Sequence, residues 1–480
     1  MNIDVIINKL KKETNNVLDI TYREKYINKK RIEIIYNESL SSSNNISDFI
    51  IRSLDIISEK NYKNILKEIE NSIDNFKYNK IYTYKEICYY INFGFTIIII
   101  DKEEYALALE TKANLSRSIS NPQTEITLRG SMDSFVENIQ TNIGLIRRRI
   151  KSNDLWIDTN EIGKHTKTTI NLIYINSICK KEYLQLIKKK LNKINIDGIT
   201  NIGTIKNLIE EEEKSILPTI ITTERPDKVS QALLSGKIVI MIDTSPFALI
   251  IPITLNDLFL STEDSYSKGI NVTVTRIIRY CAFYITLLTP AIYIAITTYN
   301  QEMLPTQLLT SIASQRANVP FPTIFEAIIM LTTFEILREC DLRLPTFTTS
   351  ALSIVGALVL GEAAVNAGIV SPIMIIIISI TEVSALLFTE PELISAIRWY
   401  RVIFMISANF LGIYGITCTL IYFITKLVSL DSFGLPYLYP FSPININSLK
   451  NSIIKFPIKY LRKRDTNLSN NINRYGSVKQ

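Results

Sequence analysis

Histidine is almost absent from this sequence. Of its 480 residues, His165 is the one histidine. The five cysteines are far apart and form no C-x-x-C pair: Cys88, Cys179, Cys281, Cys340 and Cys418. Hydrolase triads need a histidine, and thiolate zinc sites or disulfide frameworks need closely placed cysteines. We therefore predict no metal, no cofactor and no enzymatic activity.

Phosphate-binding loops and a secretion signal are also missing. No G-x-G-x-x-G or G-x-x-x-x-G-K-[ST] motif follows any expected strand, which disfavours nucleotide binding. The segment Met1 to Glu13 is interrupted by lysines and has no cleavage site, so we expect the N-terminus to stay in the cytoplasm.

The net charge of +7 does not indicate nucleic acid, because Lys and Glu alternate through the first half. The one dense basic cluster comes near the C-terminus: Lys455, Lys459, Arg462, Lys463 and Arg464. Its position after an apolar region favours a tail that faces anionic membrane lipid, with no nucleic-acid partner.

Long apolar runs are confined to the second half and predict a membrane domain. Tyr280 to Thr298 is the clearest span, and Phe321 to Leu337, which carries Glu326 and Glu335, is the doubtful one. Three further runs follow, two of them with a carboxylate: Phe347 to Val370 with Glu362, Pro372 to Phe388 with Glu382, and Val402 to Thr425.

The number of crossings stays open. Arginines flank the runs in pairs and are expected on the cytoplasmic side: Arg276 and Arg279, Arg338 and Arg343, Arg398 and Arg401. Five spans would leave the basic tail outside, although its charge favours the cytoplasm. Either one segment only dips into the membrane, or Phe433 to Phe441 helps the chain to return.

Small residues fall on one helical stripe of the Phe347 to Val370 run: Ser353, Ala357, Gly361, Ala364 and Gly368. Such stripes either let helix backbones approach closely or leave room beside a pore. The adjacent Glu362 favours the second interpretation, because an intramembrane carboxylate usually faces a bundle interior or a wet path.

The first half alternates strand and helix patterns, as in α/β domains. We expect strands at Phe95 to Ile100, Thr168 to Ile175 and Lys237 to Ile242, and helices at Lys180 to Lys193 and from Pro226 to Leu234. A capping box of Ser134 and Glu137 predicts another helix start, with Arg147, Arg148 and Arg149 on its mostly solvated face.

These patterns predict an α/β N-terminal cytoplasmic region of two subdomains followed by an α-helical polytopic membrane domain. The expected divisions are a variable segment at 1–48, the first subdomain at 49–185 and the second at 186–275. The membrane domain is expected at 276–430, with four to six helical segments, and a basic tail at 431–480.

Read together, several motifs resemble those of the A-subunit family of bacterial spore germination receptors. The matching stretches are Arg129-Gly130, Glu224-Arg225-Pro226-Asp227, Ser245-Pro246-Phe247-Ala248, Val319-Pro320-Phe321-Pro322, Glu335-Ile336-Leu337-Arg338-Glu339, Arg343-Leu344-Pro345 and Ser432-Phe433-Gly434-Leu435-Pro436-Tyr437. The sequence departs from the family pattern at Ser131, where proline is expected, and at Glu362, where glutamine is usual. Its Ile-, Asn- and Lys-rich composition indicates a clostridium-like source.

The resemblance implies a nutrient receptor in the spore inner membrane with a cytoplasmic N-terminal region. It further implies a self-associating, pentameric ligand-gated ion channel that works with a transporter-like B subunit and a lipoprotein C subunit.

An ion-coupled secondary transporter that uses Glu326, Glu362 and Glu382 is the alternative, although we find no internal repeat that would favour it. A third interpretation has the intramembrane glutamates merely protonated or ion-paired inside the bundle, for example with Arg338 or Arg343.

Overall fold

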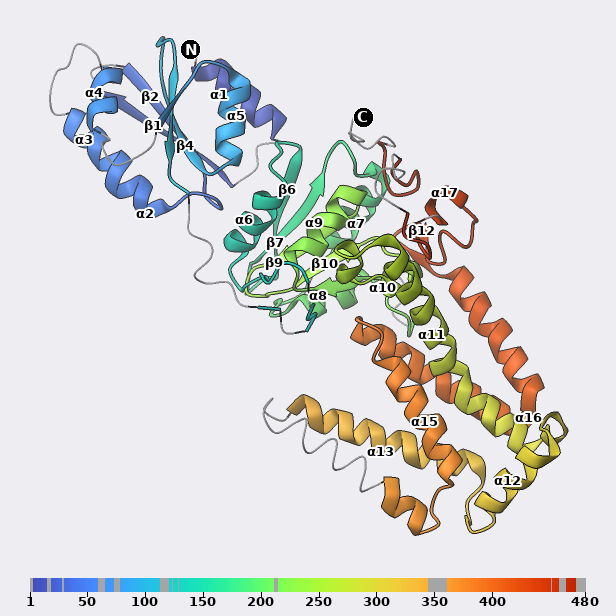
Figure 1. The fold of residues 1–480 in the computed structure, drawn as a ribbon. Coiled ribbons are helices and arrows are strands. Elements are labelled where there is room, and N and C mark those ends of the chain that lie inside the picture. The colour runs from blue at the N-terminus through green and yellow to red at the C-terminus, as the bar shows by residue number, and fades with distance from the viewer. Residues whose placement is uncertain are drawn as a thin grey trace.

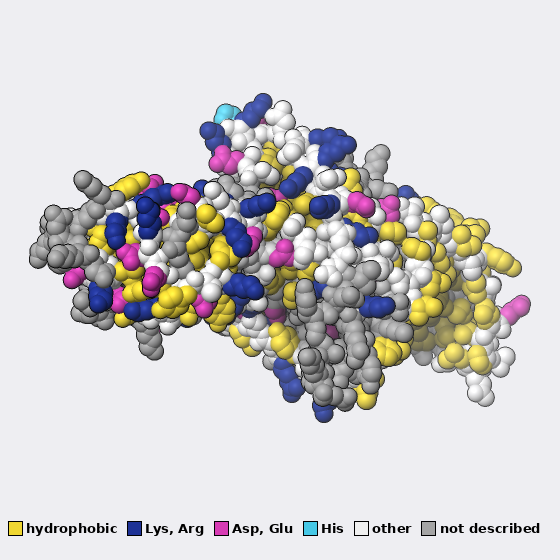
Figure 2. All heavy atoms as spheres, turned by 90° about the horizontal axis from the view of Figure 1, so that it is seen from above, with side chains coloured by type: hydrophobic (Ala, Val, Ile, Leu, Met, Phe, Trp, Pro, Cys, Tyr) yellow, Lys and Arg dark blue, Asp and Glu magenta, His cyan; other side chains and the backbone are white. Residues whose placement is uncertain are grey.

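The chain folds into two α/β units followed by a helical bundle, as a computed structural model shows (Figure 1). The structure describes residues 3–14, 19–27, 30–58, 65–72, 78–112, 121–122, 124–127, 129–210, 215–343, 361–449, 451–456 and 463–471. Hydrophobic side chains gather over the helical end, whereas charged side chains are spread over the α/β units (Figure 2).

The first α/β unit is a five-stranded antiparallel sheet, in the order β1-β2-β4-β5-β3, with helices on both faces. Successive residues of β4 turn to opposite faces, so that Ile97 and Ile99 join one hydrophobic cluster and Ile98 and Ile100 the other. Its elements are α1 (Ile3–Glu13), β1 (Ile20–Ile27), β2 (Lys30–Asn37), α2 (Ser43–Asn45), a π-helical turn (Ile46–Ile51), α3 (Arg52–Ser58), α4 (Ile65–Ser72), β3 (Tyr78–Ile81), α5 (Tyr84–Asn92), β4 (Phe95–Ile100) and β5 (Ala106–Glu110).

The second α/β unit contains another five-stranded antiparallel sheet, in the order β6-β7-β9-β10-β8. Helix α9 begins at Pro226 and ends at Gly236, whose positive φ of 100° suits glycine. The elements are α6 (Ile139–Arg149), β6 (Leu155–Ile162), β7 (Thr168–Ile175), α7 (Lys181–Lys193), α8 (Ile202–Ile209), β8 (Ile221–Thr223), α9 (Pro226–Ser235), β9 (Ile238–Ile242), β10 (Ala248–Ile251) and α10 (Leu255–Phe259).

The expected strands and helices of the first half are confirmed apart from one helix start, whereas the expected domain divisions differ from the two sheets. Residues 20–37 supply two strands of the first sheet rather than a separate variable segment, and position 185 lies inside α7 of the second unit. The strands of each sheet are distant in sequence, so local patterns do not indicate which of them pair.

One expected helix start was wrong. Helix α6 begins at Ile139, and its N-cap is Asn138, whose side chain accepts hydrogen bonds from the backbone N–H groups of Gln140 and Thr141. The expected capping box at Ser134 lies upstream of the helix, where Phe135 N–H bonds to the Glu224 carbonyl. Asparagine satisfies the free N–H groups of a helix start as well as serine does.

Among the described residues of the bundle, two helices are long and apolar enough to cross a membrane, α11 and α16. Helix α13 contains most of the doubtful run Phe321 to Leu337, and α15 is a shorter apolar helix. The described helices of this part are α11 (Gly269–Thr298), a 3-10 turn (Gln301–Met303), α12 (Thr306–Arg316), α13 (Thr323–Arg343), α15 (Pro372–Ala385) and α16 (Pro391–Ser429).

Helix α16 is folded in two at Gly412, so the run Val402 to Thr425 is not a single straight span. Gly412 has φ 60° and ψ −139°, a conformation open essentially to glycine alone. The rings of Tyr400 and Phe423 have centroids 4.6 Å apart, although a straight helix would separate these residues by about 35 Å. The two arms, 391–411 and 413–429, are about 31 Å and 25 Å long.

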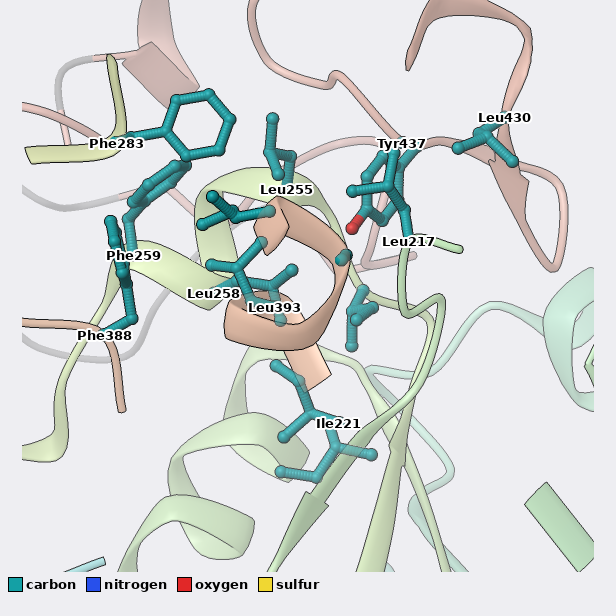
Figure 3. Packing of buried hydrophobic residues seen from close by; sticks show 14 of the residues in the cluster. Leu217, Ile221, Leu255, Leu258, Phe259, Phe283, Phe388, Leu393, Leu430 and Tyr437 are labelled. Carbon is teal, nitrogen blue, oxygen red and sulfur yellow. The ribbon is translucent and has the colours of Figure 1, made fainter. Parts of the chain in front are cut away.

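The second α/β unit and the bundle share one hydrophobic core. A single cluster runs from the inner face of the second sheet through α10 to α11, α15 and α16. At the centre of this contact, Phe259 lies against Phe283 and Phe388, with ring centroids 5.4 and 5.9 Å away, and Leu393 lies beside Leu258 (Figure 3).

The described part of the C-terminal tail packs on the second α/β unit. It includes β11 (Asp431–Ser432), β12 (Leu435–Pro436) and α17 (Ile446–Leu449). Phe433 and Leu435 are fully buried in the outer core of the second sheet, and Ser432 Oγ donates to the Thr219 carbonyl at 2.8 Å. The apolar piece Phe433 to Phe441 therefore closes a protein core.

A buried ion pair joins the two α/β units. Arg147 on α6 is 2% exposed and donates to both carboxylate oxygens of Asp19, with Nε–Oδ2 at 2.5 Å and Nη2–Oδ1 at 3.0 Å. The expectation of a solvated Arg147 was therefore wrong, whereas Arg148 is exposed. The carboxylate partner of Arg147 is Asp19 of the first unit. The helical pattern within α6 does not show a partner from another unit.

We predict that Arg147→Ala destabilises the contact between the units by about 3–5 kcal/mol, because it leaves Asp19 buried without its cation. Trp156, whose Nε1 donates to the Glu13 carbonyl across the same interface, supplies a fluorescence signal for denaturant unfolding. The neighbouring Arg148→Ala is the matched control and should unfold like the wild type. Equal effects of the two substitutions would contradict this role for Arg147.

Candidate transmission site and membrane carboxylates

The N-terminal end of α16 is fixed to the second α/β unit by two lysines. Glu390, the N-cap residue of α16, accepts from Lys228 of α9 at 2.5 Å. Lys228 also pairs with Glu125 at 3.3 Å, so one ammonium bridges two carboxylates. Next to them, Lys206 of α8 pairs with Glu392. We call these five residues the α16 joint.

Burial and charge oppose each other in the α16 joint. Burial lowers the pKa of Lys228, but the nearby carboxylates of Glu390 and Glu125 outweigh it, and the net pKa is raised. Burial raises the pKa of Glu125, an effect that Lys228 partly offsets and Glu390 reinforces. The lysine therefore stays charged at neutral pH.

The beginning of α11 forms a second charged contact, which we call the α11 joint. Asp264 accepts from Arg276 at 3.0 Å and from Arg279 at 3.0 Å. Arg276 also donates to the carbonyls of Asn451 and Ser452 in the C-terminal tail, at 2.7 and 3.1 Å. The flanking arginines thus tie α11, the α/β unit and the tail together.

The motif residues before α9 form a clasp. Arg225 is 1% exposed, and its guanidinium donates to the carbonyls of Glu125 and Ser131 and to the carboxylate of Asp227. Glu224 accepts from the backbone N–H of Thr124. This clasp holds the segment 124–131 over α9 and so brings Glu125 to Lys228.

The structure also places the other family-motif residues of the α/β region. Gly130 has φ 153°, and a Cβ there would lie 3.2 Å from Arg225, whereas Arg129 is exposed. Pro226 is the first residue of α9. Ser245 and Pro246 stand in the connection between β9 and β10, after which Phe247 packs on the outer core of the sheet.

Glu326 is buried at the end of the bundle farthest from the α/β units. Its Oε2 accepts from the backbone N–H and the hydroxyl of Ser371, at 2.9 and 2.8 Å, and its Oε1 lies 3.4 Å from Arg316. The loop before α15 is thereby fixed to the start of α13.

Two further carboxylates of the bundle are paired with arginines. Glu335 contacts Arg338 on its own helix and Arg398 of α16 at 2.5 Å. Glu382 of α15 accepts from Arg401 at 2.8 Å. These contacts support the ion-paired interpretation of the intramembrane glutamates, with Arg338 as one partner. Glu339 is exposed, and the side chain of Arg343 lies outside the described residues.

The small-residue stripe is described only in its last part. Ser353 and Ala357, like the motif residue Pro345, lie outside the described residues. A Cβ on Gly361 would have nothing within 4 Å, Glu362 is exposed, and Ala364 packs against the shared core.

Gly368 does not extend the stripe. The helix that contains Gly361 ends at Asn366, and Gly368 follows in a turn with φ 65°. The expected helix to Val370 is therefore too long, because the left-handed backbone of a glycine ends a helix.

The sequence did not indicate the α16 joint. A glutamate and a proline before an apolar run signal a helix start, and Glu390 and Pro391 fit that pattern. The lysine partners of Glu390 and Glu392 lie more than 150 residues earlier, however, and nothing local connects them. Within the described part of the chain, no cluster of three His, Cys, Asp or Glu side chains could hold a metal ion.

These features define a class of protein in which an α/β unit is joined firmly to a bundle that contains membrane-length helices. Comparison with known proteins identifies the family. Residues 8–467 match the family model described as Bacillus/Clostridium GerA spore germination protein. The chain therefore belongs to the GerA family of spore germination proteins.

Similar proteins cover almost the whole chain. It is 39% identical over 467 residues to spore germination protein KA of Bacillus subtilis (strain 168), which covers 96% of this chain and 85% of the relative. It is 32% identical over 466 residues to spore germination protein GerLA of Bacillus cereus, with coverage of 96% and 95%.

Among solved structures, the crystal structure of the N-terminal domain of the A subunit of the Bacillus megaterium spore germinant receptor GerK3 matches 52% of this chain and 94% of its own. The TM-score is 0.41 and the identity 29%.

We predict that Gly412→Ala destabilises the bundle by about 1–3 kcal/mol, because alanine is strained at this φ and ψ. Its Cβ would also lie 2.8 Å from Asn300 Oδ1. Thermal unfolding in detergent, followed by circular dichroism, measures the loss. Gly361→Ala is the control, since its Cβ meets open space and alanine favours a helix. A Gly412→Ala protein as stable as this control would rule out the strained turn.

We predict that Glu125→Gln changes the pH dependence of stability. Because the pKa of Glu125 is raised above 4.5, the folded chain takes up a proton at a pH where the unfolded chain does not. This contribution is complete below the unfolded pKa and is lost as the pH rises through the folded pKa. The wild type should therefore gain stability relative to the variant on acidification toward about pH 4.5. Melting temperatures at a series of pH values measure this difference, and a constant difference would contradict the prediction.

Proposed function

We propose that this chain is a subunit of a nutrient-responsive spore germination receptor, and that copies of its bundle assemble, as a pentamer, into a ligand-gated ion channel. A transporter-like B subunit that binds the nutrient and a lipoprotein C subunit complete the receptor. The receptor lies in the spore inner membrane and signals by releasing ions when it opens.

The observation that carries this proposal is the firm connection between the second α/β unit and the bundle. One hydrophobic core and two charged joints link the unit to α11 and α16. A state change in either part therefore changes contacts in the other, and a ligand shifts such an equilibrium by its differential affinity for the two states.

The fold-back of α16 supports a polytopic arrangement in which the N-terminal region and the tail lie on the cytoplasmic side. The chain enters α16 at Glu390 and leaves it at Leu430, and both positions lie at the α/β unit. The membrane domain covers residues 276–430 in this arrangement. In this arrangement α16 contributes two passes, which makes the number of crossings even and favours a tail on the cytoplasmic side.

We assign the pore wall to residues 347–366, whose small side chains leave room and whose Glu362 differs from the glutamine usual in relatives. The transporter alternative is weaker, since Glu326 and Glu382 each have an arginine partner. A coupling carboxylate must exchange its cation during transport, and a fixed arginine prevents that exchange.

We predict that Gly361→Trp lowers germinant-triggered cation flux at least about tenfold in vesicles that contain all three subunits, because the bulky ring fills the pore. Val383→Trp is the matched control, since Val383 is 65% exposed on α15 and its ring would face lipid. Flux recorded with a potassium-sensitive dye, together with cross-linking to count the copies, tests the proposal.

Undiminished flux through correctly assembled Gly361→Trp receptors would reject this pore wall. A wild-type receptor that responds to germinant without any cation flux would reject the channel itself.

A further inference from the structure

A cavity of about 860 Å³ lies where the C-terminal tail crosses the second α/β unit. One face of α9 supplies a wall, with lining residues at helical spacing: Lys228, Gln231, Ala232 and Ser235. The segment from Thr254 to Thr262 supplies the second wall, and tail residues supply the third, including Tyr439, Ser448, Asn451 and Phe456.

The size and lining of the cavity suit a small organic molecule. Pockets for such ligands measure about 300–1,000 Å³ and combine an apolar body with a few polar groups. The apolar lining residues are Ile221, Ile250, Leu260, Phe456 and Leu468. Hydroxyl and amide groups from all three walls surround them. A single metal ion or phosphate would leave most of this volume unfilled.

The charge of the lining favours an anion. The described residues contribute four cationic side chains, Lys228, Lys237, Lys463 and Arg464, against the two carboxylates of Asp257 and Asp465. Lys228 and Lys237 are largely buried, with side chains 14% and 8% exposed. Lys237 pairs with Asp257 at 2.7 Å and Lys228 with Glu125 and Glu390, so the cationic excess of the lining comes from Lys463 and Arg464 of the tail. Positive charge in a recess bordered by protein attracts anions more strongly than the same charge on an open surface.

The position of the cavity connects it to both joints. Lys228 in its wall holds Glu390 at the start of α16, and the carbonyls of Asn451 and Ser452 accept from Arg276 of α11. An anion that contacts Lys228 competes with Glu390 for the same ammonium. A molecule in this cavity thus acts directly on the attachment of two bundle helices.

We propose that this cavity is a regulatory binding site for a small amphipathic organic anion, whose carboxylate contacts Lys228 and whose apolar body lies on Ile250 and Leu260. Binding weakens the ion pair between Lys228 and Glu390. The site belongs to this chain alone, and its existence does not depend on the proposed ion channel.

Isothermal titration calorimetry of the full-length protein in nanodiscs of zwitterionic lipid tests the site, with phenylacetate as the probe. Phenylacetamide has the same shape without the charge and should bind at least about tenfold more weakly. Inorganic phosphate, which has the charge without the apolar body, should also bind more weakly. Because no flux is measured, the result is independent of channel activity.

Two variants locate the binding. Ser235→Trp fills the cavity and should abolish phenylacetate binding, whereas Gln185→Trp on the exposed face of α7 should leave it unchanged. Lys463→Gln removes a cation from the rim and should weaken binding about three- to tenfold, with exposed Lys189→Gln as its control.

Equal affinity for phenylacetate and phenylacetamide would overturn the proposal. So would no saturable heat up to about 10 mM phenylacetate, or binding that both cavity variants retain.

Discussion

The architecture depends on a hydrophobic core that does not stop at the edge of the second α/β unit. One cluster contains the apolar side chains of the inner face of the second sheet, of α10 and of the bundle helices. Phe259, Phe283 and Phe388 lie where the unit meets the bundle. Protein interiors are close-packed, so neither part can slide on the other without opening voids or exposing apolar surface. The unit and the helices that it holds must therefore move together or repack together.

Charged contacts add direction to this apolar attachment. Burial of apolar surface is non-directional, whereas Lys228 with Glu390 and Arg276 with Asp264 each fix one register of a helix against the unit. The clasp around Arg225 positions Glu125 for the same purpose. Motif residues that carried the family resemblance thus lie beside the joints rather than in a catalytic pocket.

Local signals predicted the elements well and their assembly poorly. The β-branched run of β4, the amphipathic spacing of α7 and the proline and glycine around α9 were sufficient, because each signal lies within its element. The burial of Arg147 escaped prediction because its partner Asp19 is 128 residues away. Of the candidate site, ion pairing of the intramembrane glutamates was one of the alternatives that the sequence left open, but the joints depend on contacts between distant segments. The turn in α16 depends on one glycine, Gly412, inside an apolar run. A glycine in such a run is also typical of close helix packing, so the sequence alone did not indicate a turn.

That turn at Gly412 bears on how the protein is made. A helical hairpin whose two ends stay at the α/β unit can enter the bilayer as one closed piece, led by its tip. In the proposed arrangement with a cytoplasmic tail, the basic residues that follow it never cross the hydrocarbon, and Phe433 and Leu435 pack on the second sheet on the side where they were synthesised. Completion of the soluble core and completion of the bundle thereby become a single late step in biogenesis.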